Sequence, residues 1–186
     1  MVFKESFKLE SRHRAVSFHD ITDKVKEIAA RSGLKDGIVV VYSHHTTCSV
    51  ITQECAFDMS MTGLETLQQD LVNCFEEWIP TCRYEGQYLH PGQKALVFAE
   101  EHGEDNFGCH NTDAHLRSSI IGRNVTIVTV DGEMDLGEFG RIHFIDWDQI
   151  QNWDLTFSDH VHPTADGHKV VTEEISKILS EHYDEQ

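Results

Sequence analysis

Hydrophobic and polar positions change their period several times along the first third of the chain. Apolar residues alternate with polar ones across 3–18, which predicts a half-buried antiparallel hairpin. From Asp20 the spacing becomes helical, and Gly33 suits the left-handed position that ends such a helix. The continuous apolar run at 37–42 predicts a central strand buried on both faces, with 44–52 as its hairpin partner.

The middle of the chain carries the longest amphipathic pattern. Apolar residues three and four positions apart across 59–78 predict a helix, which Pro80 ends. Beyond it, residues 81–107 are predicted to be irregular, with a short strand or lid element at 95–98.

The last part of this region predicts a helix followed by strands. The helix spans 112–121, and strands at 125–130 and 142–145 lie on either side of the hairpin turn signal Asp131-Gly132. Helices and strands therefore mix without a regular strand–helix–strand repeat. We predict a largely antiparallel α+β fold rather than a doubly wound parallel sheet.

Composition narrows the classes of partner. The chain has 186 residues, enough for one domain with an appendage, and its formal charge of -17 repels nucleic-acid phosphates and anionic lipid heads. No stretch has the length of a signal-peptide core or a bilayer span. The 5 cysteines form no CxxC pair, so neither a disulfide framework nor a thiolate zinc knuckle is expected. We expect a soluble, cytoplasmic protein that binds a small-molecule substrate, with no nucleic acid or membrane as partner.

Histidines, acidic residues and a cysteine crowd into residues 100–116. Imidazole is the commonest protein ligand of transition metals and the side chain that changes charge nearest to neutral pH. The cluster therefore indicates metal binding or proton transfer, and the alternative is a solvated acidic loop in which the histidines are incidental.

Three ordered blocks carry a family resemblance. They are His45-Thr46-Thr47-Cys48-Ser49 followed by Gln53-Glu54, then Tyr88-Leu89-His90, then Asp113-Ala114-His115-Leu116 running on to Asp131-Gly132 and Leu136-Gly137. In this order they resemble the YjbQ-like family, small proteins often labelled secondary thiamine-phosphate synthases. The resemblance covers about Phe3 to Asp148 and is most specific from Asn111 to Gly137.

The resemblance implies a β-sandwich of mostly antiparallel strands with flanking helices. It also implies a homotrimer in which histidines hold a divalent metal near the subunit boundary. By position the metal ligands are His45, His90 and His115, and three imidazoles with an open fourth position suit zinc. The resemblance also implies Asp113 and Glu54 as acid–base groups or as groups that orient the ligands. The further candidate site residues are Glu138 as a catalytic group and Thr46, Asn111, Arg117 and Phe139 as substrate contacts, with Arg117 as a nearby cation for a phosphate.

The chain departs from the family pattern in two places. Where the family usually has Thr-Trp-Gln after Leu-Gly, this sequence has Glu138-Phe139-Gly140, which keeps an aromatic plane but replaces an amide with a carboxylate. The family is also generally shorter before Asn111, so 91–110 is predicted to be an insertion within a YjbQ-like domain at 1–150. This insertion makes His102 and His110 alternative metal ligands.

Residues 151–186 are predicted to form a C-terminal extension with a helix. Within it, Asp159 and His162 resemble the last block of SGNH hydrolases, although no Gly-Asp-Ser block supplies the nucleophile that they would activate.

Three hypotheses about function follow from the sequence. The first is a metal-dependent homotrimeric enzyme that acts on a small phosphorylated metabolite, with a weak thiamine-phosphate synthase-like transferase activity implied by the family. The second is a non-catalytic metal- or metabolite-binding module, and the third is an SGNH-like hydrolase.

Overall fold

The computed structural model describes residues 2–11, 15–103 and 110–148, and the chain divides into two compact units. The first unit comprises Met1–Thr81 and Asn111–Gln149, and the second comprises Cys82–His110 and Ile150–Gln186. Both sheets lie in the first unit, and within the second unit the structure describes one helix.

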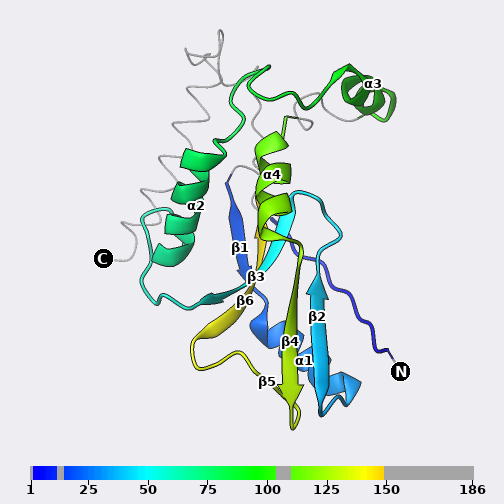
Figure 1. Ribbon diagram of the computed structural model, residues 1–186, viewed down its shortest axis with the longest axis vertical. Helices are drawn as coiled ribbons and strands as arrows, with labels where there is room; N and C mark the ends of the chain where they lie inside the picture. The colour runs from blue at the N-terminus through cyan, green and yellow to red at the C-terminus, as the bar shows by residue number, and fades with distance from the viewer. Residues whose placement is uncertain (1, 12–14, 104–109, 149–186) are drawn as a thin grey trace. The chain divides into compact units, whose positions relative to one another are not determined.

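The first sheet has the strand order β1-β6-β3 and is antiparallel throughout (Figure 1). Its strands are β1 (Ser17–Asp20), β3 (Cys48–Glu54) and β6 (Gly140–Asp146). Cys48 lies opposite Asp146, and Glu54 lies opposite Gly140. Since each strand residue advances by about 3.3 Å, the two ends of β3 are about 20 Å apart.

The second sheet has the order β2-β4-β5 and is also antiparallel. Its strands are β2 (Gly37–Tyr42), β4 (Asn124–Val130) and β5 (Glu133–Met134). Asp131 and Gly132 have φ of 54° and 86°, as a type I′ hairpin turn requires, so the predicted turn is confirmed. The strand that returns from the turn is β5. Residues 142–145 do form a strand, but as part of β6 they join the other sheet.

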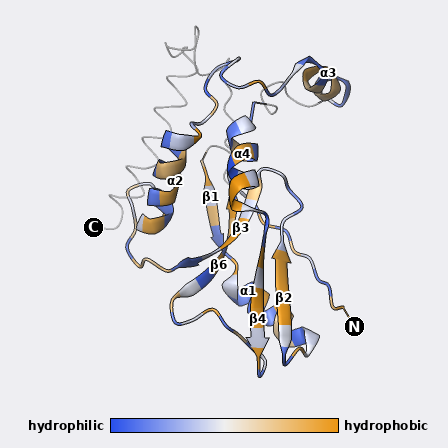
Figure 2. Cartoon of the chain, in the orientation of Figure 1, coloured by the Kyte–Doolittle hydropathy of each residue, from blue (hydrophilic) through white to orange (hydrophobic). Residues whose placement is uncertain are grey.

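The prediction that 37–42 is a central strand buried on both faces is wrong. β2 is an edge strand that pairs with β4, and Ile38, Val40 and Tyr42 are 62%, 56% and 48% exposed. Its predicted hairpin partner is also wrong, because β3 pairs with β6. In Figure 2 most of β2 and much of β4 have the colour of hydrophobic residues. A continuous run of apolar residues is therefore as compatible with a strand surface that another molecule covers as it is with a strand buried inside the fold.

The predicted N-terminal hairpin is wrong as well. Residues 2–11 form no strand or helix, and β1 pairs with β6. Alternation of apolar residues identifies a two-faced extended segment but not its partner, because strand pairing is decided by residues far along the chain.

Two of the four described helices begin and end close to where their patterns predict. They are α1 (Thr22–Ser32) and α4 (Thr112–Ile121). Asp20 Oδ1 accepts the backbone N–H of Thr22 at 2.9 Å, and Gly33 ends α1 with φ of 71°. The other two are α2 (Thr66–Trp78) and α3 (Gln93–Glu101), and both differ from the prediction.

α2 is shorter than predicted because a capping box formed by Glu65 and Gln68 begins the helix after residue 65. α3 occupies the position where a short strand or lid element was predicted at 95–98, so that prediction is wrong. None of the helices that the structure describes is long and apolar enough to cross a bilayer.

The core of the first unit lies where α1 and strands of both sheets meet. Its buried cluster consists of Ile21, Val25, Val50, Ile127 and Ile142. These residues come from α1, β3, β4 and β6, with Ile21 just before the helix. The predicted antiparallel α+β class is therefore confirmed.

Candidate functional site

His45 and His115 both lie beside the residues that lead into β3, although they are 70 positions apart in the chain. His45 precedes β3, and its Nδ1 lies 2.7 Å from the hydroxyl of Thr47. His115 lies in the first turns of α4, and its Nδ1 lies 3.3 Å from the carbonyl oxygen of Thr46. A carbonyl only accepts, so Nδ1 of a neutral His115 carries the proton and Nε2 carries the lone pair. Thr46 thus links the two predicted histidines.

Asp148 lies within electrostatic reach of both imidazoles. The side chain is half-buried just beyond β6, and burial is the main reason that the pKa of its carboxyl is raised. Asn111 Nδ2 donates to Asp148 at 3.3 Å and opposes this increase in the pKa, as do the charges of His45 and His115, whereas the charge of Asp146 adds to it. This carboxyl therefore keeps a proton to higher pH than an ordinary aspartic acid does.

The end of β6 is held firmly around a buried tryptophan. Trp147 is fully buried, its Nε1 donates to Ser49 Oγ at 2.9 Å, and its backbone N–H donates to Thr47 O at 3.2 Å. The backbone N–H of Asp148 donates to Asp146 Oδ1 at 3.0 Å. These bonds fix the two carboxylates beside the loop that carries His45, so little reorganisation is needed for them to act together.

Cys48 is a neutral thiol at this site. Burial, followed by the negative charge of Asp146, raises its pKa to about 12. Only the thiolate is an effective nucleophile or metal ligand, so this side chain serves as a weak hydrogen-bonding group at neutral pH.

Arg117, a predicted substrate contact, is completely buried and holds α4 against the end of α2. Its guanidinium donates to Glu76 Oε1 at 2.8 Å and to Ile79 O at 2.7 Å, and it also bonds Thr81. Burial would raise the pKa of Glu76, but hydrogen bonds from Thr81 and Arg117 outweigh burial and lower it. A substrate contact through Arg117 stays a prediction.

Asp113, a predicted catalytic group, lies in the first turn of α4, where the helix dipole favours a carboxylate. The side chain is buried, and its Oδ2 is 3.9 Å from Nη1 of Arg117. Its geometry favours a role in positioning α4, and its catalytic role stays a prediction.

Three other predicted site residues lie at the opposite end of the first sheet. Glu54 ends β3, and Glu138 and Phe139 precede β6. The ring of Phe139 packs edge-on against Phe57 at 6.0 Å. Within one chain these residues are about 20 Å of strand away from Cys48, so they do not join the His45–His115 group.

The remaining predicted histidines lie in the second unit. His90 and His110 border a cavity of about 140 Å³, together with Cys82, Glu85 and Tyr88 among others. His102 ends α3, where its Nδ1 lies 2.7 Å from Phe98 O and its ring stacks on that of Phe98 at 3.9 Å. The predicted meeting of His90 with His45 and His115 stays a prediction.

The described side chains do not complete a zinc site on their own. Among residues 2–11, 15–103 and 110–148, no three His, Cys, Asp or Glu side chains form a group that could hold a metal ion. Asp159 and His162, with the rest of the predicted C-terminal extension, lie outside the described residues.

Sequence reasoning missed Asp146 and Asp148. The available signal was a pair of acidic residues on either side of Trp147 at the end of the apolar strand pattern. Acidic residues that alternate at the end of a buried strand point to one side of the sheet, where a loop can bring partners to them.

Comparison with known proteins gives one consistent family. Residues 5–159 match the family described as UPF0047 protein YjbQ-like. A UPF0047 protein of Methanocaldococcus jannaschii is 31% identical over 148 residues, which cover 80% of this chain and 86% of that protein. The UPF0047 protein YugU of Bacillus subtilis is 25% identical over 129 residues, which cover 69% and 78%. These names do not support the thiamine-phosphate synthase label.

Two solved structures are similar in fold and sequence. A hypothetical protein of Aeropyrum pernix is 28% identical with a TM-score of 0.57, over 78% of this chain and 88% of that one. A conserved hypothetical protein of Thermus thermophilus is also 28% identical, with a TM-score of 0.52, over 77% and 90%.

Proposed function

The chain belongs to the YjbQ-like (UPF0047) family, and from that premise we propose that it is an enzyme acting on a small phosphorylated metabolite. The chemistry is acid–base catalysis by His45, His115 and Asp148. One observation carries the proposal: a half-buried carboxyl with a raised pKa lies within reach of the charges of two imidazoles. Perturbed titratable groups gathered in this way are typical of catalytic sites.

Each group has a defined part in this proposal. Nε2 of neutral His115 accepts the proton of an attacking water or hydroxyl, since Nδ1 already donates to Thr46 O. The carboxylate of Asp148 stabilises the imidazolium that results. His45, when protonated, donates to a phosphate oxygen or to the leaving oxygen, which supplies positive charge in a chain whose net charge would otherwise repel a phosphate.

The test is turnover of a panel of phosphate esters and lactones, with thiamine phosphate formation as one assay. We expect one class of substrate to react and His45→Ala, His115→Ala and Asp148→Asn each to lower kcat/KM by about 10²- to 10⁴-fold. Asp135→Asn, an exposed aspartate beyond β5, is the matched control. Wild-type rates in all three variants, with circular dichroism confirming that they fold, would contradict the proposal.

A divalent metal, with zinc as the first candidate, is proposed as the alternative to the base role of His115, because one Nε2 lone pair cannot both bind a metal and accept a proton. The tautomer of His115 supports it, since the lone pair on Nε2 is the one that would bind a metal. Metal analysis of purified wild type, His45→Ala and His115→Ala tests it, and His90→Ala and His110→Ala then identify a further ligand. Unchanged metal content in folded variants would remove these histidines from the metal site, and bound metal without turnover would favour a non-catalytic binding module.

We also propose that the protein assembles as a homotrimer through the outer face of β2 and β4. This face consists of Ile38, Val40, Tyr42, Val128 and Val130, all of them about half exposed or more. Ile38 lies opposite Val128 in the sheet register, so the side chains form one surface. An apolar face of this kind is usually covered by another protein surface.

Light scattering after size exclusion tests the assembly. Val40→Lys places a charge in the centre of the outer face, and we expect it to convert the trimer to monomers at micromolar concentration. Met61→Lys, at an exposed loop position, is the control and should leave the mass unchanged. A wild-type protein that runs as a monomer would contradict the proposal.

A further inference from the structure

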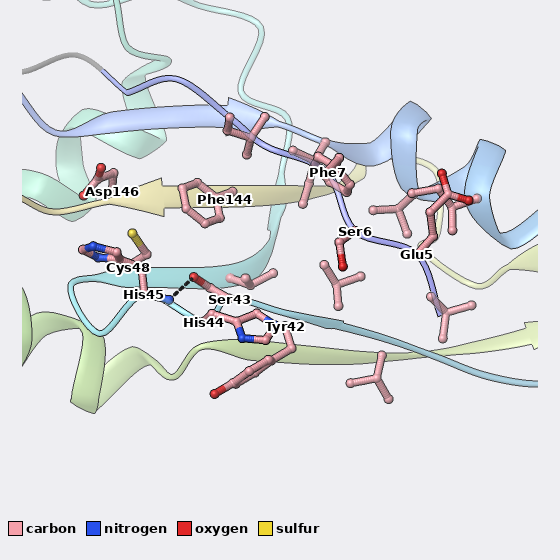
Figure 3. Close-up of a pocket in the computed structure, with 18 of the residues that line it drawn as sticks. Glu5, Ser6, Phe7, Tyr42, Ser43, His44, His45, Cys48, Phe144 and Asp146 are labelled. Carbon is pink, nitrogen blue, oxygen red and sulfur yellow. Dashed lines mark hydrogen bonds between the residues drawn. The ribbon is translucent and has the colours of Figure 1, made fainter. Parts of the chain in front are cut away.

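A cavity of about 510 Å³ lies in the first unit between the two sheets (Figure 3). Val39 and Val41 of β2 line one side of it, and Val50 of β3 and Phe144 of β6 line the other. Glu5 and Ser6 of the N-terminal segment lie on the side away from His45 and Asp146 (Figure 3), and Ile28 of α1 also lines the cavity. Its walls are therefore built from several elements far apart in sequence.

The lining of the cavity is apolar between two polar regions. His45, Cys48 and Asp146 lie at one end, Glu5 and Ser6 lie toward the other, and Phe144 lies between them (Figure 3). The valines of β2 and β3 add to the apolar lining. Ser43 Oγ accepts the backbone N–H of His45 at 3.2 Å, which keeps its hydroxyl proton for donation. A protonated thiol, a hydroxyl, an imidazole and a carboxylate thus gather where the apolar channel ends.

We infer that this cavity binds the apolar body of an amphipathic substrate and places its polar reacting group at His45. The inference rests on the proposed function, because it names the substrate class of the site to which His45 belongs; His45 is the member of that site that lines the cavity. The volume lies within the range of about 300–1,000 Å³ that is usual for pockets that hold small organic molecules. Aliphatic chains and aromatic rings are the bodies that fit walls of this composition.

The apolar lining supports an occupant of this kind. Protein interiors are close-packed and contain few voids larger than one water molecule, so a space of this size between the two sheets is room that a ligand can fill. Apolar cavities stay dry and take up apolar molecules, whereas a polar metabolite would lose its hydration without gaining partners along the valine walls.

The N-terminal segment provides a route of entry. Residues 2–11 form no strand or helix and are mostly exposed, yet they supply one wall of the cavity. Glu5 ties this segment to α1 through an ion pair with Arg31 at 2.5 Å. An irregular, solvent-exposed segment opens at low cost, so the apolar body can enter without unfolding either sheet.

Calorimetric titration with butyl, hexyl and octyl phosphate tests the inference. We expect the affinity to rise about fourfold for each methylene added, until the chain fills the cavity, with a negative heat-capacity change. Ile28→Trp, which fills the cavity from α1, should abolish this dependence on chain length. Ala30→Trp, at an exposed position on the same helix, should preserve it. Val39→Phe fills the cavity from β2 if Ile28→Trp does not fold.

Alkyl alcohols of the same lengths separate the two proposals. If alcohols and phosphates bind with the same dependence on chain length, the cavity binds the apolar body as we infer. This result would stand even if no phosphate is turned over and the proposed function fails. Turnover of short phosphate esters with no effect of chain length on binding overturns the inference and leaves the proposed function standing. Failure of every probe to bind folded protein also overturns the inference.

Discussion

The two ends of the first sheet carry similar residues in different surroundings. At the first end, where β3 begins, the Asp148 carboxyl is half-buried, accepts a hydrogen bond from Asn111 and lies within electrostatic reach of two imidazoles. At the second end, where β3 finishes, Glu54 and Glu138 are exposed to solvent. The sequence predicted catalytic carboxylates at the second end, Glu54 and Glu138, and none beyond β6. The comparison teaches that burial and grouping, rather than the presence of an acidic side chain, make a carboxyl chemically distinctive.

The difference between the ends originates in α4. This helix supplies Asn111 at its start and His115 one turn later, and Ser118 Oγ bonds the carbonyl of Cys48 at 2.6 Å. No described helix supplies a comparable set of partners to Glu54 or Glu138. Anything that shifts α4 should therefore affect the first end and leave the second unchanged.

The largest expected effect comes from Asp148→Asn, which removes the charge that distinguishes the first end. We predict a loss of about 10²- to 10⁴-fold in kcat/KM, because the imidazolium loses its counter-charge. Steady-state kinetics on the substrate found in the ester panel measures it. A loss confined to KM would show that Asp148 only binds the substrate, and the two ends would then differ less than we infer.

Arg117→Met tests whether the position of α4 creates the difference. It leaves the partly buried Glu76 and the buried carbonyl of Ile79 without their cation, so we expect the free energy of unfolding to fall by about 1–3 kcal/mol. Arg123→Met is the control, since this arginine stacks on Tyr42 near the surface and should cost about 1 kcal/mol or less. Urea denaturation measures both, and equal small changes would show that another contact holds the helix.

Sequence patterns predicted the elements whose boundaries depend on nearby residues. α4 ends at a glycine, and the Asp131-Gly132 turn needs two positive φ angles, so both could be located from the sequence. The partners of β1, β2 and β3 could not be located in this way, because strand pairing depends on residues 80 or more positions away. The same limit explains why Asp148 was missed: its altered pKa depends on burial and on partners that meet only after folding.

The pH dependence of stability gives a smaller but sharper test of the first end. Because the pKa of Asp148 is raised by folding, the folded state binds the proton more tightly than the unfolded state does. Stability should therefore fall as pH rises from the ordinary aspartate pKa through the raised one. Thermal unfolding across this window should show the decline in wild type and a weaker decline in Asp148→Asn. An identical profile in both would mean that Asp148 is not perturbed.

Glu54→Gln and Glu138→Gln should have the smallest effects, less than about threefold in kcat/KM, because exposed carboxylates far from the histidines neither transfer protons nor hold the substrate. Each variant keeps the size of the side chain and removes its charge, so folding should be unaffected. The same kinetic assay measures both. A loss as large as that of Asp148→Asn would mean that the distant end of a neighbouring subunit's first sheet reaches His45 in the proposed trimer. The two ends would then form one site made by two chains, and their contrast would hold only within a single chain.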